Sequence, residues 1–100
     1  MIDWPALEGF EWDAGNERKS ELEHAVSSGE AEQMFFIQPV VVSADVGRSK
    51  LEPRWHALGA ADAGRLLHVT FTLRAGGRLI RVISARDMHR KERSIYAQNR

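Results

Sequence analysis

Apolar residues recur with helical spacing in the first third of the chain and with strand-like spacing after Pro39. Asp13 is a suitable N-cap, because its side-chain oxygen can accept a hydrogen bond from a free N–H of a first helical turn. We therefore predict a helix over about residues 14–25. Its apolar side is expected to carry Leu22, Ala25 and Val26.

A second, short helix is predicted directly afterwards. Ser27 is followed three residues later by Glu30, a spacing typical of a capping box. This helix is expected to run through Ala31, Met34 and Phe35. Pro39 ends it, because the residue before a proline is pushed out of the helical region.

The rest of the chain favours strands, after a brief extended segment at residues 10–12 that precedes both helices. Alternation and β-branched residues predict further strands at residues 40–42, 54–59, 66–74 and 78–85. The polar stretch 44–53 is predicted to be a surface loop, and residues 60–64 a tight connection.

Gly76-Gly77 predicts a hairpin between the last two strands. A two-residue turn sets Leu73 opposite Ile80, whereas a three-residue loop sets Phe71 opposite Arg81. The two-residue register is the more consistent one, since it also pairs Phe71 with Val82 on a core face. The other face is then partly polar and cationic, with His68, Thr70, Thr72, Arg74, Leu79, Arg81 and Ile83.

Asp87 is predicted to cap a final helix that carries Met88, Ile95 and Tyr96 on one stripe. Helices and strands are segregated along the chain rather than alternating, which is typical of an α+β domain with an antiparallel sheet. The length of 100 residues predicts a single domain over 1–100 with an irregular segment at 1–9.

Composition excludes several classes of protein. A hydrophobic fraction of 43% argues against intrinsic disorder, and the absence of cysteine excludes disulfides and thiolate metal sites. The four histidines have no ligand-like spacing, so we expect neither a metal nor another cofactor. The chain start does not resemble a signal peptide, and apolar runs are far shorter than the roughly 20 residues that span a bilayer. A cytoplasmic protein without a membrane partner is expected.

The formal net charge is zero, but the charges are segregated. The first 33 residues carry nine acids against Arg18 and Lys19. From residue 81 onward six cations stand against Asp87 and Glu92, namely Arg81, Arg86, Arg90, Lys91, Arg93 and Arg100. Segregation of this kind indicates more about partners than the net charge does.

Several short motifs occur together at fixed spacing. They are Phe10-Glu11-Trp12-Asp13, His24, Arg54-Trp55 with Leu58-Gly59, and Arg81-Val82-Ile83-Ser84-Ala85-Arg86 followed by Glu92-Arg93 and Tyr96. In these residues the chain resembles the BrnT family of small bacterial toxins, over about residues 9–97. The resemblance implies a RelE-like fold and a metal-independent endoribonuclease of a type II toxin–antitoxin system that inhibits translation by RNA cleavage. It also implies a hetero-oligomer with a DNA-binding antitoxin, BrnA, through which alone the complex contacts its operon DNA.

The first predicted helix departs from the family pattern. The family carries a lysine and an asparagine where this chain has Asn16 and Ser20. Its Lys-His-Gly-Val sequence corresponds here to Glu23-His24-Ala25-Val26, so a positive charge and a helix-ending glycine are missing. These differences predict reduced activity. They also motivate an alternative function, a non-catalytic degenerate toxin that binds its antitoxin in operon autoregulation.

Metal-free RNA cleavage requires a base for the 2′-hydroxyl, an acid for the leaving 5′-oxygen and cations for the charge at phosphorus. Arginine suits the cationic role because its planar fork binds phosphate oxygens in pairs. The predicted catalytic residues are Arg81, Arg86, Glu92, Arg93, Tyr96 and His24. The predicted RNA-binding residues are Arg54, Arg74, Arg90 and Lys91. His68 and His89 are further candidates for proton transfer, and acid and base are not assigned.

These residues also have structural interpretations. Arg81 and Arg86 fit surface ion pairs, and Glu92 fits a pair with an arginine on the sheet. Tyr96 fits packing on its apolar stripe, and His24 fits a favourable interaction with the helix dipole. Two histidines fit ordinary sheet positions, His56 and His68. The acidic first third is either a solvated pair of helices or a surface that repels RNA and attracts a basic antitoxin segment.

Overall fold

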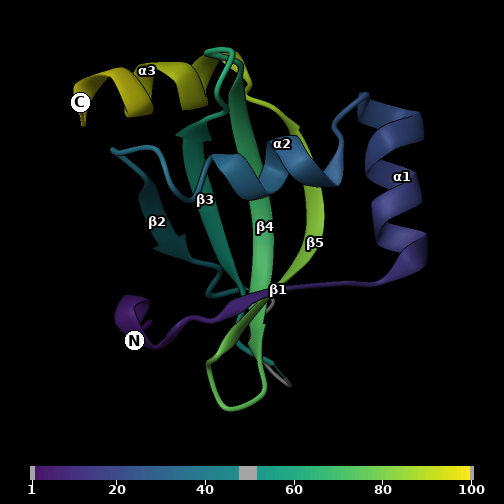
Figure 1. Ribbon diagram of the computed structural model, residues 1–100. Coiled ribbons are helices and arrows are strands. Elements are labelled where there is room, and N and C mark those ends of the chain that lie inside the picture. The colour runs from purple at the N-terminus through teal and green to yellow at the C-terminus, as the bar shows by residue number, and fades with distance from the viewer. Residues whose placement is uncertain (1, 48–51, 100) are drawn as a thin grey trace.

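The computed structural model describes residues 2–47 and 52–99. Residues 48–51, within the predicted loop 44–53, and Arg100 lie outside the described residues. In chain order (Figure 1) the elements are a 3-10 helix η1 (Trp4–Ala6), β1 (Gly9–Trp12), α1 (Ala14–His24), α2 (Ser28–Gln33), β2 (Val41–Ala44), β3 (Trp55–Ala60), β4 (Leu66–Arg74), β5 (Leu79–Asp87) and α3 (Arg90–Gln98).

The described strands form a five-stranded sheet in the order β1-β5-β4-β3-β2. Strands β2 to β5 pair antiparallel, and the predicted α+β fold is confirmed. β1 differs, because it runs parallel to β5 along Gly9–Trp12 and makes the sheet mixed. A four-residue segment carries too little pattern to reveal its pairing direction, so the sequence predicted only an extended entry there.

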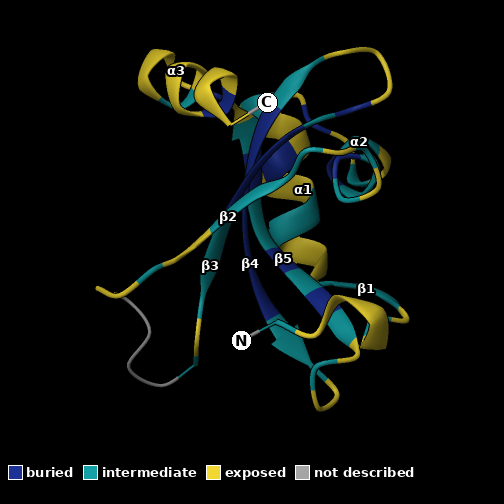
Figure 2. Ribbon diagram, turned by 90° about the vertical axis from the view of Figure 1, so that its left-hand side faces the viewer, coloured by how far each residue is buried: buried dark blue, intermediate teal, exposed yellow. Residues whose placement is uncertain are grey.

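The helices lie on opposite faces of the sheet. In Figure 1 α2 crosses in front of the strands, and in Figure 2 α1 and α2 lie on one side of the sheet while α3 lies on the other side at one end. The main core lies on the α2 side, where Met34, Leu67 and Phe71 are fully buried. Under α3 is a smaller cluster of Leu58, Met88 and Tyr96. Helix therefore covers only one end of the second face.

The N-caps predicted for the first two helices are both present. Asp13 Oδ1 accepts hydrogen bonds from the N–H groups of Gly15 and Asn16, at 2.9 and 3.2 Å. Ser27 Oγ accepts from the N–H of Glu30 at 3.1 Å, and the carboxylate of Glu30 accepts in return. Each bond satisfies an amide that the first helical turn leaves without an internal partner.

Two details of the helices were wrongly predicted. Leu22 is 78% exposed, because α1 faces β5 through Ser20, whose Oγ accepts the N–H of Ala85 at 3.2 Å. Two residues along a helix is about 200° around its axis, so Leu22 points away. α2 ends at Gln33, and Met34 and Phe35 lie in the following turn, where hydrogen bonds to residues three earlier replace the helical ones.

The predicted hairpin register is confirmed, with Leu73 opposite Ile80 and Phe71 opposite Val82. The turn is longer than two residues, since the ladder ends at the pair Arg74 and Leu79. Residues 75–77 all have positive φ, and glycine occupies two of these three positions. The loop extends equally on both sides of Gly76-Gly77, which is why the register survives.

A β-bulge in β5 decides which way the last arginines point. The pairing moves from Phe71–Val82 to Thr70–Ser84 and leaves Ile83 without a partner. Beyond a bulge the alternation of side chains shifts by one residue. Arg86 therefore pairs with His68 on the same face as Arg81, although the two arginines are an odd number of residues apart.

The predicted cap of the last helix is wrong. Asp87 is the final residue of β5, and His89 occupies the N-cap of α3. The carboxylate of Asp87 is instead bound by Arg65, 22 residues earlier in the chain. Met88 and Tyr96 are buried as expected. Among the described residues no helix has the length and apolarity needed to cross a membrane.

Candidate active site

The uncovered part of the second sheet face forms an open groove beside α3, of about 540 Å³. Its lining comes from β2 to β5 and α3, with Val41, Ser43, His56, Leu58, His68, Arg86, Glu92 and Ile95. Convergent polar groups in an otherwise apolar groove are typical of a functional site. Two of the predicted catalytic residues, Arg86 and Glu92, meet there.

Arg86 and Glu92 form a two-bond ion pair. Nη1 of Arg86 donates to Oε1 of Glu92 at 2.8 Å, and Nη2 donates to Oε2 at 2.9 Å. Oε1 also accepts the backbone N–H of His89 at 2.7 Å. These bonds, that of Arg86 first, lower the pKa of Glu92 to about 2. The carboxylate is thus ionised at neutral pH and is suited to orienting Arg86, not to donating a proton.

His68 lies beside this pair. Its Nε2 is 3.9 Å from Oε2 of Glu92, and the residue is only 8% exposed. Nδ1 is buried and has no hydrogen-bond partner among the described residues. Burial, followed by the nearby charge of Arg86, lowers the pKa of His68 to about 4. The ring is therefore neutral at pH 7 and can accept a proton.

The second histidine of the groove, His56, is held on both sides. Its ring centroid is 5.0 Å from that of His68. Nε2 of His56 is 3.0 Å from Oδ2 of Asp45, and Nδ1 is 3.1 Å from Oγ1 of Thr70. In the sequence His56 fitted an ordinary sheet position. Its place beside His68 follows from the pairing of β3 with β4, which makes the two histidines diagonal neighbours on one face of the sheet. A predicted register for these two strands would have revealed it.

The remaining predicted catalytic residues lie outside the groove. Nη2 of Arg81 is 3.3 Å from Oδ2 of Asp13. Arg93 donates from Nη1 to the carbonyl of Met88 at 3.0 Å, and the Tyr96 hydroxyl donates to the carbonyl of Pro39 at 3.0 Å. His24 lines a separate hollow of about 460 Å³ at the end of α1, which Arg86 also lines.

The four predicted RNA-binding residues lie in different parts of the structure. Nη2 of Arg74 is 3.2 Å from Oε2 of Glu52, and Arg54 is half-buried immediately before β3. Arg90 and Lys91 are exposed in the first turn of α3, next to Glu92 in the chain. None of the four lines the groove as the described residues define it. No group of three or more described His, Asp or Glu side chains is arranged to hold a metal ion.

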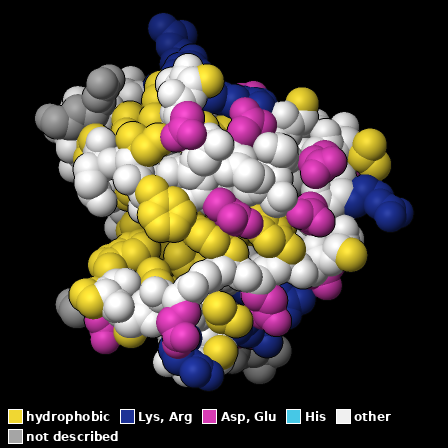
Figure 3. Space-filling view, viewed as in Figure 1, with side chains coloured by type: hydrophobic (Ala, Val, Ile, Leu, Met, Phe, Trp, Pro, Cys, Tyr) yellow, Lys and Arg dark blue, Asp and Glu magenta, His cyan; other side chains and the backbone are white. Residues whose placement is uncertain are grey.

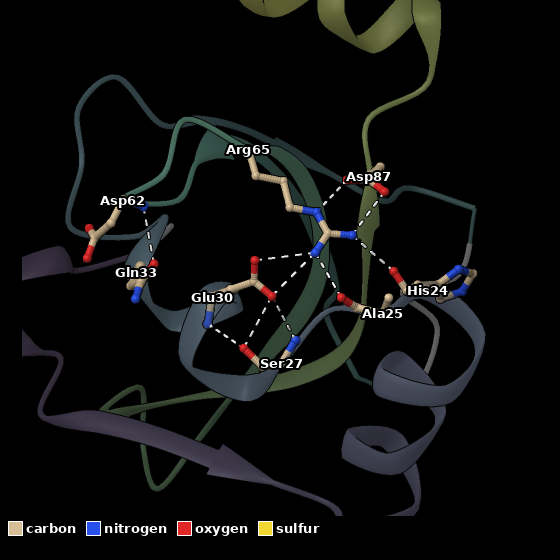
Figure 4. Close-up of polar contacts among 8 residues, drawn as sticks. All are labelled: His24, Ala25, Ser27, Glu30, Gln33, Asp62, Arg65 and Asp87. Atoms are coloured by element: carbon tan, nitrogen blue, oxygen red, sulfur yellow. Dashed lines mark hydrogen bonds and ion pairs between the residues drawn. The ribbon is translucent and has the colours of Figure 1, made fainter.

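Arg65, which was not among the predicted residues, ties the end of β5 to both N-terminal helices (Figure 4). Nε and Nη2 donate to the two carboxylate oxygens of Asp87 at 2.7 and 3.0 Å. Nη1 donates to Glu30 at 3.3 Å and to the carbonyl of Ala25 at 2.8 Å, and Nη2 also donates to the carbonyl of His24 at 3.1 Å. These bonds raise the pKa of Arg65 and lower that of Asp87. Arg65 therefore fixes the strand end from which Arg86 projects.

Together, the mixed α+β sheet and its open groove bring an arginine, a carboxylate and a histidine to one place, a set of groups that can bind an anionic ligand such as a phosphate. The family model of the ribonuclease toxin BrnT, of type II toxin–antitoxin systems, matches residues 12–92. This chain belongs to the BrnT family of ribonuclease toxins, as the sequence motifs predicted.

The fold is also found in a solved structure. The crystal structure of the Brucella abortus ribonuclease toxin BrnT is 21% identical to this chain, covers 82% of it and 97% of its own length, and superposes with a TM-score of 0.56. At this identity the likeness supports the fold alone. A search of curated proteins gave no significant match.

Proposed function

We propose that this chain is a metal-independent endoribonuclease toxin that inhibits translation by cleaving RNA in the groove beside α3. The observation that carries the proposal is the meeting of Arg86, Glu92 and His68 in one open groove. A guanidinium beside a neutral imidazole provides a phosphate ligand and a base at one place.

Arg86 is the proposed phosphate ligand. Glu92 binds one edge of its guanidinium, and in the described part of the chain Nε has no hydrogen-bond partner. The edge formed by Nε and Nη2 can therefore donate two parallel bonds to phosphate oxygens. A guanidinium that is already oriented loses little freedom when the negative charge at phosphorus develops.

His68 is the proposed base. The 2′-oxygen loses its proton to Nε2 of His68 and attacks phosphorus, while the bond from phosphorus to the 5′-oxygen breaks. The 5′-oxygen takes a proton from water in the open groove, and the imidazolium returns its proton to solvent. The products are a 2′,3′-cyclic phosphate and a 5′-hydroxyl. Asp45 and Thr70 hold His56 against His68 and so restrict the base to one orientation.

The other predicted site residues have supporting roles in this proposal. Arg93 binds the carbonyl of Met88, between β5 and α3, and Tyr96 binds the carbonyl of Pro39, ahead of β2. These bonds hold α3, and with it Glu92, in place. Arg81 lies on the same sheet face as Arg86, and His24 lines a neighbouring hollow that Arg86 also lines, so we assign to both a contact with RNA beyond the cleaved phosphate. Steering of RNA toward the groove falls to Arg54, Arg74, Arg90 and Lys91.

The decisive experiment is RNA cleavage by the purified chain in excess EDTA, with the product ends mapped and a cell-free translation assay run in parallel. We expect cyclic phosphate ends, and a fall in kcat/KM of at least about 100-fold for Arg86→Lys and for His68→Asn. Arg86→Lys keeps the charge but loses the fork. Arg78→Ala, at an exposed arginine of the hairpin loop, is the matched control and retains full activity. Absence of cleavage by a folded sample contradicts the proposal.

A second function is favoured by the ion pairs at the predicted RNA-facing arginines. Arg74, Arg81 and Arg86 each pair with an acid, which leaves less positive charge for RNA. This suits a non-catalytic member that binds its antitoxin and acts in operon autoregulation. Growth arrest on expression of the chain alone, abolished by Arg86→Ala, excludes this second function.

Partners follow from the same proposal. A BrnA-like antitoxin neutralises the chain in a hetero-oligomer in the cytoplasm, and DNA is contacted only through that antitoxin. Co-purification of the two proteins, followed by operator binding with and without the antitoxin, tests this arrangement.

A further inference from the structure

A second groove lies on the helix-covered side of the sheet, away from the candidate active site. Two adjoining hollows of about 320 and 390 Å³ share Trp4, Phe35 and Gln38. We call them together the aromatic groove. Its walls come from η1, β1, β2, β5 and the turn after α2, chiefly through Trp4, Phe10, Phe35, Phe36, Val42 and Ile80.

The aromatic rings of this groove are packed as a fixed platform. Phe35 contacts the buried ring of Phe71 edge-on at 5.3 Å between centroids, and it also lies 5.6 Å from Phe10. Phe10 in turn lies 6.0 Å from Phe36. Yet Phe36 is 76% exposed and Trp4 is 43% exposed. Large aromatic side chains that are held in place and exposed together are typical of a protein-binding surface.

The charge around the groove selects the kind of partner. The residues that line it include one charged side chain, Glu8, whose Oε2 is 3.6 Å from Nε of Arg78 in an exposed pair. Residues 2–42 carry nine acids against Arg18 and Lys19. Figure 3 shows the hydrophobic hollow with acidic side chains on both sides of it, while lysine and arginine lie toward the edges of the view. RNA and anionic lipid are repelled by such a surface, whereas a basic polypeptide is attracted.

We infer that the aromatic groove is the docking site for a basic, amphipathic segment of the antitoxin, which places an apolar anchor side chain against Phe36 and Trp4. This inference rests on the antitoxin partnership proposed above, and it does not depend on catalysis. The anchor supplies affinity by burying the exposed rings, and its flanking Lys or Arg residues face the acidic side chains on both sides of the groove.

The test is the affinity of the full chain for the purified product of the neighbouring antitoxin reading frame, measured by calorimetry. Phe36→Ala is expected to raise Kd at least tenfold, because it removes an exposed ring without disturbing the core. Leu22→Ala is the matched control, since Leu22 is equally exposed on α1 but does not line the groove. It is expected to change Kd less than twofold. Raising the salt concentration is expected to weaken wild-type binding.

RNA cleavage by Phe36→Ala is expected to equal that of the wild type, because the ring lies outside the candidate active site. Equal Kd values for the two variants overturn the inference, as does a wild-type chain that binds no antitoxin. Self-association that Phe36→Ala abolishes assigns the groove to a second copy, and a selective loss of RNA binding assigns it to RNA. If the chain cleaves no RNA but Phe36→Ala still weakens antitoxin binding, the proposed ribonuclease fails and the docking site stands.

Discussion

Among single residues, His68 is a buried titratable group whose surroundings act on its pKa in opposite directions. Burial and the charge of Arg86 oppose its protonation, while Glu92 favours it, and the net result is a pKa of about 4 against an ordinary value near 6.5. In the unfolded chain neither burial nor these neighbours act on the ring. Protonation of His68 is therefore coupled to unfolding.

The expected result is a loss of stability on acidification. Between pH 6.5 and 4 the unfolded chain binds a proton that the native His68 does not, so the free energy of unfolding falls by up to about 3 kcal/mol. Glu92, with its pKa lowered to about 2, gives a further and separate loss between about pH 4.5 and 2. Urea unfolding at pH 7, 6, 5 and 4 measures the first loss. His68→Asn is expected to flatten the curve above pH 4.5, and a curve parallel to that of the wild type contradicts the assignment.

At the scale of elements, Arg65 connects α1, α2 and the end of β5, and no local sequence pattern predicted this connection. It satisfies the last carbonyls of α1 and two carboxylates at once. Hydrogen bonds from a charged donor contribute more than neutral ones, and the side chain is three-quarters buried.

Arg65→Ala is accordingly expected to lower the free energy of unfolding by about 2 kcal/mol, which corresponds to about 10 °C in the melting temperature of a chain of this size. Arg65→Lys keeps the charge but not the fork and is expected to recover only part of the loss. The exposed Arg78→Ala is the control, with a change below about 0.5 kcal/mol. Thermal unfolding by circular dichroism makes the comparison, and equal melting temperatures for the Arg65 and Arg78 variants refute the role of the tie.

Local patterns predicted the elements well wherever the physical cause was also local. Asp13, the pair Ser27 and Glu30, and the glycines at the hairpin act within a few residues, and each was identified. The bulge at Ile83 was not, because adjacent apolar residues such as Val82 and Ile83 fit a strand that is covered on both faces as well as a bulge. Asp87 has the right chemistry for an N-cap, but a distant arginine binds it instead.

For the candidate site, too, local motifs were predictive and contacts between distant residues were not. Family motifs predicted Arg86 and Glu92, which meet across a strand and a helix, and both line the groove. His56 gave no motif, since its importance arises only when β3 pairs with β4. The pairing of strands is a property of the whole sheet, and composition and spacing along one strand do not contain it.

Across the whole molecule, ion pairs join the acidic first third to basic residues of the last strand and its hairpin, such as Arg81 with Asp13 and Arg78 with Glu8. These pairs partly neutralise the charge that is segregated along the chain. Exposed cations that remain beside the groove, Arg90 and Lys91, carry the predicted electrostatic attraction for RNA. Each phosphate contact to single-stranded RNA releases about 0.7 counterion.

The double variant Arg90→Ala, Lys91→Ala is therefore expected to reduce the slope of log K against log salt by about 1.4. Binding is measured with 2′-O-methyl RNA, which lacks the attacking hydroxyl and is not cleaved. The other consecutive pair of exposed cations, on α1, is the control, and Arg18→Ala, Lys19→Ala leaves the slope unchanged. An equal effect of both double variants contradicts RNA binding at α3.

β2 separates the two grooves. Val42 lines the aromatic groove, whereas its neighbours Val41 and Ser43 line the groove that holds His68 and Arg86. Successive side chains of a strand point to opposite faces. Substitutions at neighbouring residues of β2 therefore change different surfaces of the protein. Selection can therefore change the fit of the proposed antitoxin segment at one residue and the fit of the proposed RNA substrate at the next. A substitution at Val42 can accompany a change in the partner while Val41 and Ser43, which line the candidate active site, stay the same.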